Sequence, residues 1–304
     1  MRVSFIVTLW REPDMFRRIG VVGAGTMGRS IAEMLAVKGL DVLLVEKSAE
    51  SLESAMEMLE SSLDRQMERW AITLAEKKLI LNRIHKHKSL QDLGECDLVI
   101  ETVSEDLDVK KTVFEELDRA LPPAAILASN TSTLSLTELA GVTRHPERVI
   151  GMHFVYPAFR IDVVEIIRGL QTSEETFRQT KDFTENVLAK KGVMVYESPG
   201  FVTTRLICLL INEALHLMEE GVATPEDIDN AMRIGYQFQH GPLEMADRFG
   251  LDAVWAALDR MFREYGELKY RPSFLLKKKV RAGQLGLKTG YGFFAYDKDG
   301  ERMA

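Results

Sequence analysis

A strand, a glycine-rich turn and a helix follow one another near the start of the chain, and this succession constrains the fold more than any other feature. Residues 18–22 form a compact apolar run typical of a buried strand, and Gly-Ala-Gly-Thr-Met-Gly follows at 23–28. Residues 30–38 carry apolar side chains at helical spacing and stop at Gly39. A second apolar run at 41–46 completes a βαβ unit with a right-handed crossover, which predicts a parallel sheet.

The glycine turn has the spacing that lets a backbone approach a dinucleotide. Gly23 permits the tight turn, Gly25 lets the backbone come close to a pyrophosphate, and Gly28 allows the helix to pack closely on the strand. Thr26 and Met27 lie at the helix start, where backbone amides and the positive end of the helix dipole favour phosphate. The motif predicts a dinucleotide site; the alternative is a glycine turn that binds nothing.

The end of the second strand predicts which dinucleotide is bound. Glu46 lies eighteen residues after Gly28, where a carboxylate accepts hydrogen bonds from the adenosine ribose hydroxyls. A carboxylate at this place repels the 2′-phosphate of NADP, so NAD is the expected cofactor. The neighbouring Lys47 carries the opposite charge, and the preference for NAD is therefore open at this stage.

Strands and helices alternate to about residue 197, which predicts an α/β domain. Further strands are expected at 96–101, 125–128, 149–154, 163–167 and 193–195, with a helix at 109–120 and a long helix or helical pair at 49–81. After Ser198-Pro199-Gly200 the pattern becomes helical, at 202–220, 225–234, 251–265 and 273–282. We expect a Rossmann-type NAD-binding domain at 1–197, with 1–15 an N-terminal extension, and an all-α domain at 198–304.

Composition excludes several classes of protein. Hydrophobic residues make up 46% and charged residues 28%, which is ordinary for a globular enzyme and excludes disorder. No apolar run reaches the roughly 18 residues of a membrane-spanning helix, so no membrane association is expected. The net charge of −7 argues against a nucleic-acid partner.

The cysteines and histidines encode no disulfide framework and no metal site. Cys96 and Cys208 are far apart and in no metal-binding spacing, which favours a reducing cytoplasm and argues against secretion. His85 and His87 form a His-x-His pair without neighbouring partners, which predicts a charged surface turn.

Hydroxyl and amide side chains gather after the strand at 125–128. Residues 129–133 read Ser-Asn-Thr-Ser-Thr, and open α/β sheets bind ligands beyond the carboxyl ends of such strands. Ser132 and Asn130 are therefore candidates for ligand contact. The alternative is that these hydroxyls cap a helix that begins near Leu134, and both interpretations can hold together.

A histidine and a carboxylate form a candidate acid–base pair. His153 lies at the end of the strand at 149–154, and Glu165 lies twelve residues later inside an otherwise apolar strand. A buried carboxylate needs a partner. Glu165 bound to one imidazole nitrogen would orient His153, whose other nitrogen could accept a proton from a substrate hydroxyl. The alternative is a structural histidine.

These segments in this order resemble the 3-hydroxyacyl-CoA dehydrogenase family in its short monofunctional form. The resemblance covers the chain from Phe16 onward. Its matching segments are 23–28, Ser-Asn-Thr-Ser at 129–132, Gly-Met-His-Phe at 151–154 with Glu165, Pro-Gly-Phe at 199–201 with Arg205, Gly-Pro-Leu-Glu-Met-Ala-Asp at 241–247 and Gly-Leu-Lys-Thr-Gly-Tyr-Gly-Phe-Phe at 286–294. It implies NAD-dependent oxidation of an (S)-3-hydroxyacyl-CoA thioester to the 3-ketone, as in fatty acid β-oxidation, by a homodimer formed through the helical domain.

The resemblance also implies roles for individual residues. His153 would be the general base, Glu165 its orienting partner and Ser132 a hydrogen-bond donor to the C3 oxygen of the substrate. Glu105 and Lys110 match positions along the ribose and nicotinamide half of the cofactor, the alternative being a solvated helix start. For the CoA arm, the matching positions are Ser62 and Arg69, because its anionic nucleotide needs a hydroxyl and a cation.

The chain departs from the family pattern near the substrate. The family's His-Phe-Phe-Asn-Pro is His153-Phe-Val-Tyr156-Pro157 here, and an asparagine of Pro-Gly-Phe-x-x-Asn-Arg is replaced by Thr204. Thr204 can still donate one hydrogen bond to the substrate, but with a shorter reach than an amide. We also expect Arg160 to meet a carboxylate or other polar end of the acyl chain, against the alternative of a solvent-facing arginine.

Two other functions fit the departures from the family pattern. One is a dehydrogenase of a CoA-free or carboxylated 3-hydroxy acid, and free CoA as a competitor would separate it from an acyl-CoA enzyme. The other is a non-catalytic NAD-binding homologue. The presence of Ser132, His153 and Glu165 together argues against this second alternative.

Overall fold

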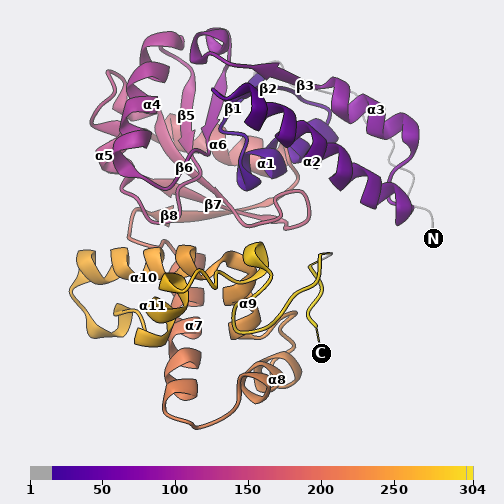
Figure 1. The fold of residues 1–304 in the computed structure, drawn as a ribbon. Coiled ribbons are helices and arrows are strands. Elements are labelled where there is room, and N and C mark those ends of the chain that lie inside the picture. The colour runs from indigo at the N-terminus through magenta and orange to yellow at the C-terminus, as the bar shows by residue number, and fades with distance from the viewer. Residues whose placement is uncertain (1–15, 299, 304) are drawn as a thin grey trace. The chain divides into compact units, whose positions relative to one another are not determined.

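The computed structural model describes residues 16–298 and 300–303, and this part of the chain divides into two compact units. One unit contains the described residues up to Thr131 together with Ser135–Glu197. The other contains Ser132–Leu134 and the described residues from Ser198 onward. Figure 1 draws the first unit in indigo to pink and the second mostly in orange to yellow. The expected extension at 1–15 lies outside the described residues.

The first unit is built on a sheet whose described strands follow the order β3-β2-β1-β4-β5-β6-β7-β8 (Figure 1). Neighbouring strands run parallel except for β6 and β7, which are antiparallel. The strands are β1 (Arg18–Val22), β2 (Asp41–Val45), β3 (Ile84–His87), β4 (Leu98–Glu101), β5 (Ile126–Ser129), β6 (Val149–Phe154), β7 (Val163–Arg168) and β8 (Lys191–Tyr196). This confirms the predicted α/β fold of Rossmann type.

Helices cover the sheet because helical segments follow β1, β2, β4, β5 and β7 along the chain. The helix α1 packs on β1, β2 and β3 and also contacts α2 and α3, while α4 packs with α5. The apolar side chains of β1 and β2, such as Val21 and Leu44, are fully buried beneath them. The helices of this unit are α1 (Thr26–Val37), α2 (Ala49–Glu68), α3 (Leu74–Asn82), α4 (Leu107–Ala120), α5 (Leu136–Ala140) and α6 (Glu174–Asp182).

The segment around His85 and His87 is a strand, so the prediction of a surface turn is wrong. It forms β3 at the edge of the sheet and pairs in parallel with β2. Its charged side chains conceal the strand in the sequence. Edge strands often carry such charges, because they protect the strand from pairing with other chains. Lys86 pairs with Glu53 at 2.7 Å and His87 with Asp92 at 3.1 Å.

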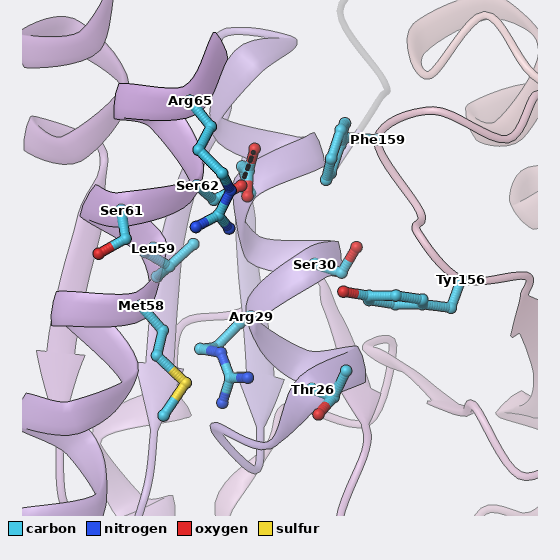
Figure 2. A pocket seen from close by; sticks show the side chains of 11 residues that line it. Thr26, Arg29, Ser30, Met58, Leu59, Ser61, Ser62, Arg65, Tyr156 and Phe159 are labelled. Atoms are coloured by element: carbon cyan, nitrogen blue, oxygen red, sulfur yellow. Dashed lines mark hydrogen bonds between the residues drawn. The ribbon is translucent and has the colours of Figure 1, made fainter. Parts of the chain in front are cut away.

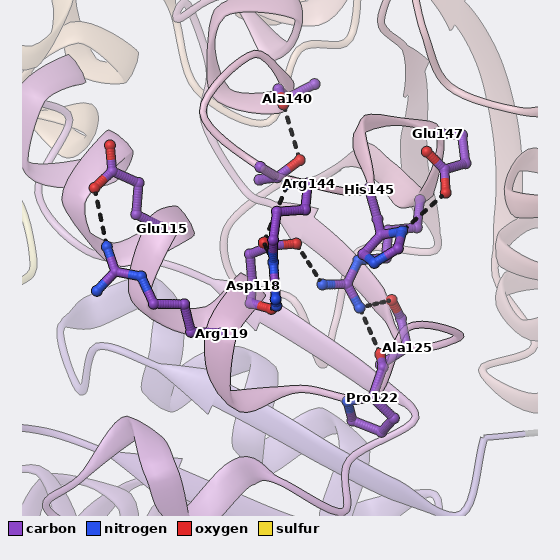
Figure 3. Close-up of polar contacts among 11 residues, drawn as sticks. Glu115, Asp118, Arg119, Pro122, Ala125, Ala140, Arg144, His145 and Glu147 are labelled. Atoms are coloured by element: carbon purple, nitrogen blue, oxygen red, sulfur yellow. Dashed lines mark hydrogen bonds and ion pairs between the residues drawn. The ribbon is translucent and has the colours of Figure 1, made fainter.

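A buried ion pair lies at the amino ends of β5 and β6 (Figure 3). The carboxylate of Asp118 accepts hydrogen bonds from Arg148 Nη2 and Arg144 Nε, both at 2.7 Å. Arg148 also donates to the carbonyls of Pro122 and Ala125 at 2.5 and 3.2 Å. Burial opposes ionisation of Asp118, but the hydrogen bonds from both arginines prevail, so its pKa lies below the ordinary value.

The second unit is helical, which confirms the predicted all-α region. Its core is formed by apolar side chains of successive helices, among them Ile211, Leu243, Leu258 and Tyr270. Asp229 caps α9, because its carboxylate accepts from the backbone N–H groups of Leu243 and Glu244. The helices are α7 (Thr203–Glu219), α8 (Pro225–Gly235), α9 (Pro242–Phe249), α10 (Leu251–Tyr265) and α11 (Phe274–Arg281).

The tail of the chain is fastened to α9 through Asp247. The carboxylate of Asp247 accepts from the backbone N–H groups of Phe293 and Phe294, both at 2.9 Å, and from the Tyr296 hydroxyl at 3.1 Å. A side chain at Gly292 would collide with this carboxylate, at 1.8 Å from its Oδ1. The segments at 241–247 and 286–294 are therefore parts of one structural joint.

Across the described part of the chain, no helix is long and apolar enough to cross a bilayer.

Candidate active site

The carboxyl ends of four parallel strands lie side by side. Val22 of β1 pairs in register with Val45 of β2 and Glu101 of β4, and Glu101 pairs with Ser129 of β5. From β1 the chain runs to β2 and β3 and then returns on the other side of β1 to form β4. Open α/β sheets bind their ligands at such a switch point.

The glycine loop after β1 has the geometry of a phosphate cradle. Gly23 has φ of +98°, which favours glycine, and a methyl group on Gly28 would lie 1.8 Å from the Gly23 carbonyl oxygen. Gly25 is exposed, and a methyl group there would meet no atom within 4 Å. Gly25 thus presents an open face, while Gly23 and Gly28 are needed by the fold itself.

The start of α1 adds backbone donors to this cradle. Gly25 is the N-cap, no side chain caps the helix, and its first turn holds no acidic residue. The exposed Thr26 begins the helix, and Met27 packs its side chain on the hydrophobic core. A ligand contact from Met27 would therefore come from its backbone amide. These uncapped amides fit an anionic group.

Glu46 lies beside the glycine loop, where the sequence predicts the adenosine ribose. Its Oε2 accepts from the backbone N–H of Ala24 at 3.2 Å, and its Oε1 accepts from that of Ser48 at 3.3 Å. These bonds fix the carboxylate and leave each oxygen capacity for a further donor. The open glycine backbone, the uncapped helix and this carboxylate together fit an adenosine dinucleotide.

Glu101, which the sequence interpretation missed, organises the neighbouring strand ends. It is fully buried, and its Oε1 accepts from Lys110 Nζ at 2.6 Å and from the backbone N–H of Val103 at 2.7 Å. Its Oε2 accepts from the Ser129 hydroxyl at 2.6 Å. Burial raises the pKa of Glu101, although the Lys110 ammonium and the hydrogen bonds oppose this. The signal in the sequence was a carboxylate at the end of an apolar strand.

Lys110 and Glu105, both predicted to lie along the cofactor, differ in their exposure to solvent. Lys110 is 1% exposed, so a solvated helix start is wrong for this residue. Besides Glu101, its ammonium contacts the Val103 carbonyl at 3.2 Å and Glu105 at 3.5 Å. The Glu105 side chain is 38% exposed and accepts from the Thr131 hydroxyl at 2.6 Å. Of the two, Glu105 is the side chain that a ligand can reach.

The polar segment after β5 is held by its neighbours rather than used as a helix cap. Asn130 donates its backbone N–H to the Glu101 carbonyl, and its side-chain oxygen accepts from the Phe154 N–H, both at 2.9 Å. The cap of α5 is Ser135, whose hydroxyl accepts from Glu138, and the helix begins at Leu136. The interpretation that residues 129–133 cap a helix at Leu134 is therefore wrong.

His153 and Glu165 are brought together by the antiparallel pair β6 and β7. They are directly opposite in register, and Nδ1 of His153 lies 2.6 Å from Oε2 of Glu165. The side chains are 9% and 1% exposed. An imidazole held at one nitrogen by a buried carboxylate has a fixed orientation, and its Nε2 can then serve in proton transfer.

Ser132 and Thr204 belong to the second unit. Ser132 is half-buried in the segment that groups with that unit, and Thr204 is half-buried in the first turn of α7. Their expected roles at the substrate stay predictions.

A cavity of about 400 Å³ lies between α1, α2 and the loop after β6 (Figure 2). Two arginines face it, Arg29 from α1 and Arg65 from α2, and Ser62 is also part of its wall. Arg69 is the C-cap of α2 and does not line the cavity. The full lining is Thr26, Arg29, Ser30, Glu33, Met58, Leu59, Ser61, Ser62, Arg65, Tyr156 and Phe159.

Hydrogen bonds tie the walls of this cavity to one another. The buried carboxylate of Glu33 accepts from Ser62 at 3.3 Å and from Gln66 at 2.5 Å, and burial raises the pKa of Glu33. Arg29 donates to the carbonyl of Ala24 in the glycine loop at 3.1 Å. The cavity therefore adjoins the predicted phosphate cradle.

The loop after β6 presents Tyr156 and Phe159 to the cavity, with Tyr156 directed toward Ser30 in Figure 2. The Ser30 hydroxyl holds this loop by accepting from the Ala158 N–H at 2.8 Å. Arg160 is exposed and is not part of the cavity lining.

Within residues 16–298 and 300–303, no group of three or more metal-binding side chains gathers that could hold an ion.

Comparison with known families decides the assignment. Residues 18–198 match the family described as 3-hydroxyacyl-CoA dehydrogenase, NAD binding domain, and residues 200–296 match its C-terminal domain. The chain belongs to this family. The 3-hydroxyacyl-CoA dehydrogenase assignment confirms the resemblance drawn from the sequence, and the chain is an oxidoreductase with NAD as cofactor.

Relatives match nearly the whole chain. It is 42% identical over 282 residues to the probable 3-hydroxybutyryl-CoA dehydrogenase of Bacillus subtilis, covering 93% of this chain and 98% of that protein. Among solved structures, FadB2 of M. tuberculosis has a TM-score of 0.91 at 38% identity. The (S)-3-hydroxybutyryl-CoA dehydrogenase PaaH1 of Ralstonia eutropha has a TM-score of 0.86 at 42% identity. Both comparisons cover 93% of this chain and 100% of the other.

Proposed function

We propose that this protein catalyses the reversible, NAD-dependent oxidation of (S)-3-hydroxyacyl-CoA thioesters to 3-ketoacyl-CoA. The observation that carries the proposal is the His153–Glu165 contact of 2.6 Å, in a chain that belongs to this family. The names of the relatives support a 3-hydroxyacyl-CoA thioester as substrate.

His153 and Glu165 are proposed to move the proton of the reaction. With Nδ1–H donated to Glu165, Nε2 of His153 is the acceptor for the proton of the 3-hydroxyl group. NAD, when bound, supplies the acceptor for the hydride that leaves C3. Glu165 keeps the imidazole in the productive orientation and stabilises its protonated form. Ser132 donates a hydrogen bond to the C3 oxygen, as the family resemblance implies.

The cofactor is proposed to lie along the carboxyl ends of the strands. Gly23, Gly25, Gly28 and the amides of Thr26 and Met27 would hold the pyrophosphate, and Glu46 the adenosine ribose. Glu105 and Asn130 would face the second nucleotide, with Lys110 beneath them.

The cavity between α1 and α2 is proposed to receive the CoA arm. Ser62 supplies a hydroxyl, while Arg65 and Arg29 supply the cations that phosphate groups require. These two arginines take the role that the sequence analysis gave to Arg69. Thr204 is proposed to donate a hydrogen bond near the thioester. The expected contact between Arg160 and a polar acyl end stays a prediction, because Arg160 is exposed on its loop.

We propose that the two units act as an NAD-binding domain (1–197) and a substrate and dimerisation domain (198–304) of a cytoplasmic homodimer. Support for a reducing compartment comes from Cys96 and Cys208, which are buried and unpaired with each other. Support for the homodimer comes from the family resemblance and from exposed apolar side chains on the helical unit.

The test is oxidation of NADH with acetoacetyl-CoA by the wild type, His153→Ala and a control histidine variant. Loss of a general acid–base group lowers kcat by about 10²–10⁴-fold, so His153→Ala should lose activity to this extent while it still binds NADH. The control is His145→Ala, because His145 also pairs with a glutamate, Glu147, but before β6 begins (Figure 3). We expect His145→Ala to retain wild-type turnover.

Other outcomes separate the alternatives. Turnover of a CoA-free 3-hydroxy acid that free CoA does not inhibit would replace the thioester by that acid as substrate. A protein that binds NADH but turns over neither class would be a non-catalytic homologue. Equal activity of His153→Ala and wild type would contradict the proposed base.

A further inference from the structure

The sheet provides two nucleotide-binding halves that are built differently. Dinucleotide folds of this kind hold one nucleotide over each half of the sheet, on either side of the switch point. The half at β1 and β2 has the glycine loop and Glu46. The half at β4 and β5 has no glycine in residues 102–107 or 130–135. Its shape must therefore come from side chains that hold these two loops in place.

The Glu101 carboxylate makes one contact with each part of this second half. It accepts from the Val103 N–H in the loop after β4, from Lys110 in the first turn of α4 and from Ser129 at the end of β5. Its own carbonyl accepts the backbone N–H of Asn130. One buried residue thus fixes three separate segments of the chain.

Two further sets of contacts connect the residues around Glu101 to the protein surface and to the half of the sheet at β1 and β2. Lys110 contacts Glu105, which also accepts from Thr131, so a partly exposed carboxylate is held above the buried pair. The hydroxyl of Thr102 donates to the carbonyls of Val22 and Gly23, both at 2.9 Å. The loop after β4 is therefore tied to the glycine loop as well.

Stability alone does not explain why an ion pair is buried here. Replacing a buried pair by apolar side chains of similar volume is often neutral or stabilising, because desolvation offsets the attraction between the charges. The arrangement of donors around Glu101 instead gives each loop a defined position. Asp118, near the end of α4, forms a second buried pair with Arg148 at the amino ends of β5 and β6, the opposite end of these strands from the two loops.

We propose that Glu101, acting with Lys110, is a positioning residue that shapes the site for the second nucleotide of the cofactor. The inference deepens the proposed function and rests on its NAD site. It assigns Lys110 to support of Glu105 and of the loop carbonyl at Val103. Binding of the first nucleotide alone does not depend on this pair.

The experiment compares the affinities of full-length Glu101→Gln for NADH and for ADP, a probe of the first half alone. Loss of a hydrogen bond to a charged partner changes a binding constant by about tenfold or more. We expect the Kd for NADH to rise by at least about this factor, while the Kd for ADP stays within about twofold of the wild type. The matched control is Asp118→Asn, which breaks the other buried pair and is expected to lower Tm with both affinities unchanged.

A second variant separates positioning from folding. Glu101→Gln combined with Lys110→Met removes both buried charges, so it is expected to recover much of the Tm lost in Glu101→Gln while its NADH affinity stays low. NADH affinity like that of the wild type in either variant would overturn the inference, as would equal losses for NADH and ADP. Wild-type protein that binds NADH without turning over any thioester would refute the proposed function and leave this binding test intact.

Discussion

Gly25 and Gly28 are glycines for different physical reasons, and substitution can separate them. A methyl group on Gly28 would lie 1.8 Å from the Gly23 carbonyl oxygen and 2.6 Å from the Thr102 hydroxyl, whereas on Gly25 it would meet nothing within 4 Å. Overpacking costs about 1–3 kcal/mol, so Gly28→Ala should lower the free energy of unfolding by about this amount and weaken NADH binding. Gly25→Ala should weaken NADH binding alone, because its methyl group occupies the open face.

Denaturant unfolding and NADH titration of both variants check this prediction. If Gly25→Ala bound NADH as the wild type does, the cofactor backbone would not pass over residue 25. Unchanged unfolding of Gly28→Ala would contradict the close approach of α1 to the strand.

Residues of the site were predictable where the signal is local in the sequence. The glycine turn and Glu46 follow from spacing, and the structure brings His153 and Glu165 together as expected from a histidine and a buried carboxylate on neighbouring strands. Glu101 was visible in the sequence only as a carboxylate at the end of an apolar strand, because its partners come from three segments that local sequence does not connect. Arg65 and Arg69 are four residues apart and so lie on the same face of α2, and the sequence alone does not tell which turn of that helix lies beside the cavity.

At the scale of elements, amphipathic helices and buried strands were predicted well and an edge strand was not. The segment at 49–81, expected as one long helix or a helical pair, is a pair, α2 and α3, separated at residues 69–73. In contrast, β3 carries His85, Lys86 and His87 and lacks the apolar pattern of a strand, since only Ile84 is buried. Pairing with β2 stabilises β3 although its side chains lack the apolar pattern of a strand. A partner strand is not visible in the local sequence.

The joint between α4 and the start of β6 should depend on pH through Asp118. Its pKa in the folded protein is below the ordinary 3.8, because hydrogen bonds from Arg144 and Arg148 outweigh the effect of burial. The unfolded chain therefore binds the proton more readily, so this stabilisation is present above about pH 4 and is lost as pH falls further. Breaking a buried pair costs about 3 kcal/mol, and Asp118→Asn should lower stability by about that amount near pH 7.

Thermal unfolding between pH 7 and pH 3 measures this effect, and the stability gap between wild type and Asp118→Asn should narrow below about pH 4. Glu115→Gln is the matched control on the same helix. It breaks only the exposed pair of Glu115 with Arg119, worth less than about 1 kcal/mol (Figure 3). A gap that stays constant down to pH 3 would show that Asp118 is not held ionised by the arginines.

At the scale of the whole molecule, the change from alternating strands and helices to helices alone marks two units, each with a hydrophobic core of its own. The order of elements is written locally and could be predicted. The joints inside each unit could not, because they join distant residues: Asp247 with Phe293 and Phe294, or Asp229 with the start of α9. The contacts of Asp247 join the segments at 241–247 and 286–294, which are distant in the sequence.

The proposed homodimer is a property of the whole molecule that solution mass can test. Large apolar side chains are exposed on the helical unit, where Leu206, Ile234 and Leu268 are 65%, 73% and 74% exposed. These side chains are the candidates for the proposed interface, because the core of a protein interface is apolar. We expect light scattering to give twice the chain mass of 34.4 kDa. At least one of Leu206→Glu, Ile234→Glu and Leu268→Glu should shift the mass toward the single chain.

Leu170→Glu is the control, because Leu170 is an equally apolar residue of the first unit and is 86% exposed. A charge at this position should leave the dimer intact if association proceeds through the helical unit. Dissociation by Leu170→Glu alone would move the interface to the first unit, and a wild-type mass of 34.4 kDa at all concentrations would contradict the dimer. Because each of these charges is placed on an exposed side chain, a change in mass would report association rather than loss of the fold, and unchanged Tm of the variants would verify this.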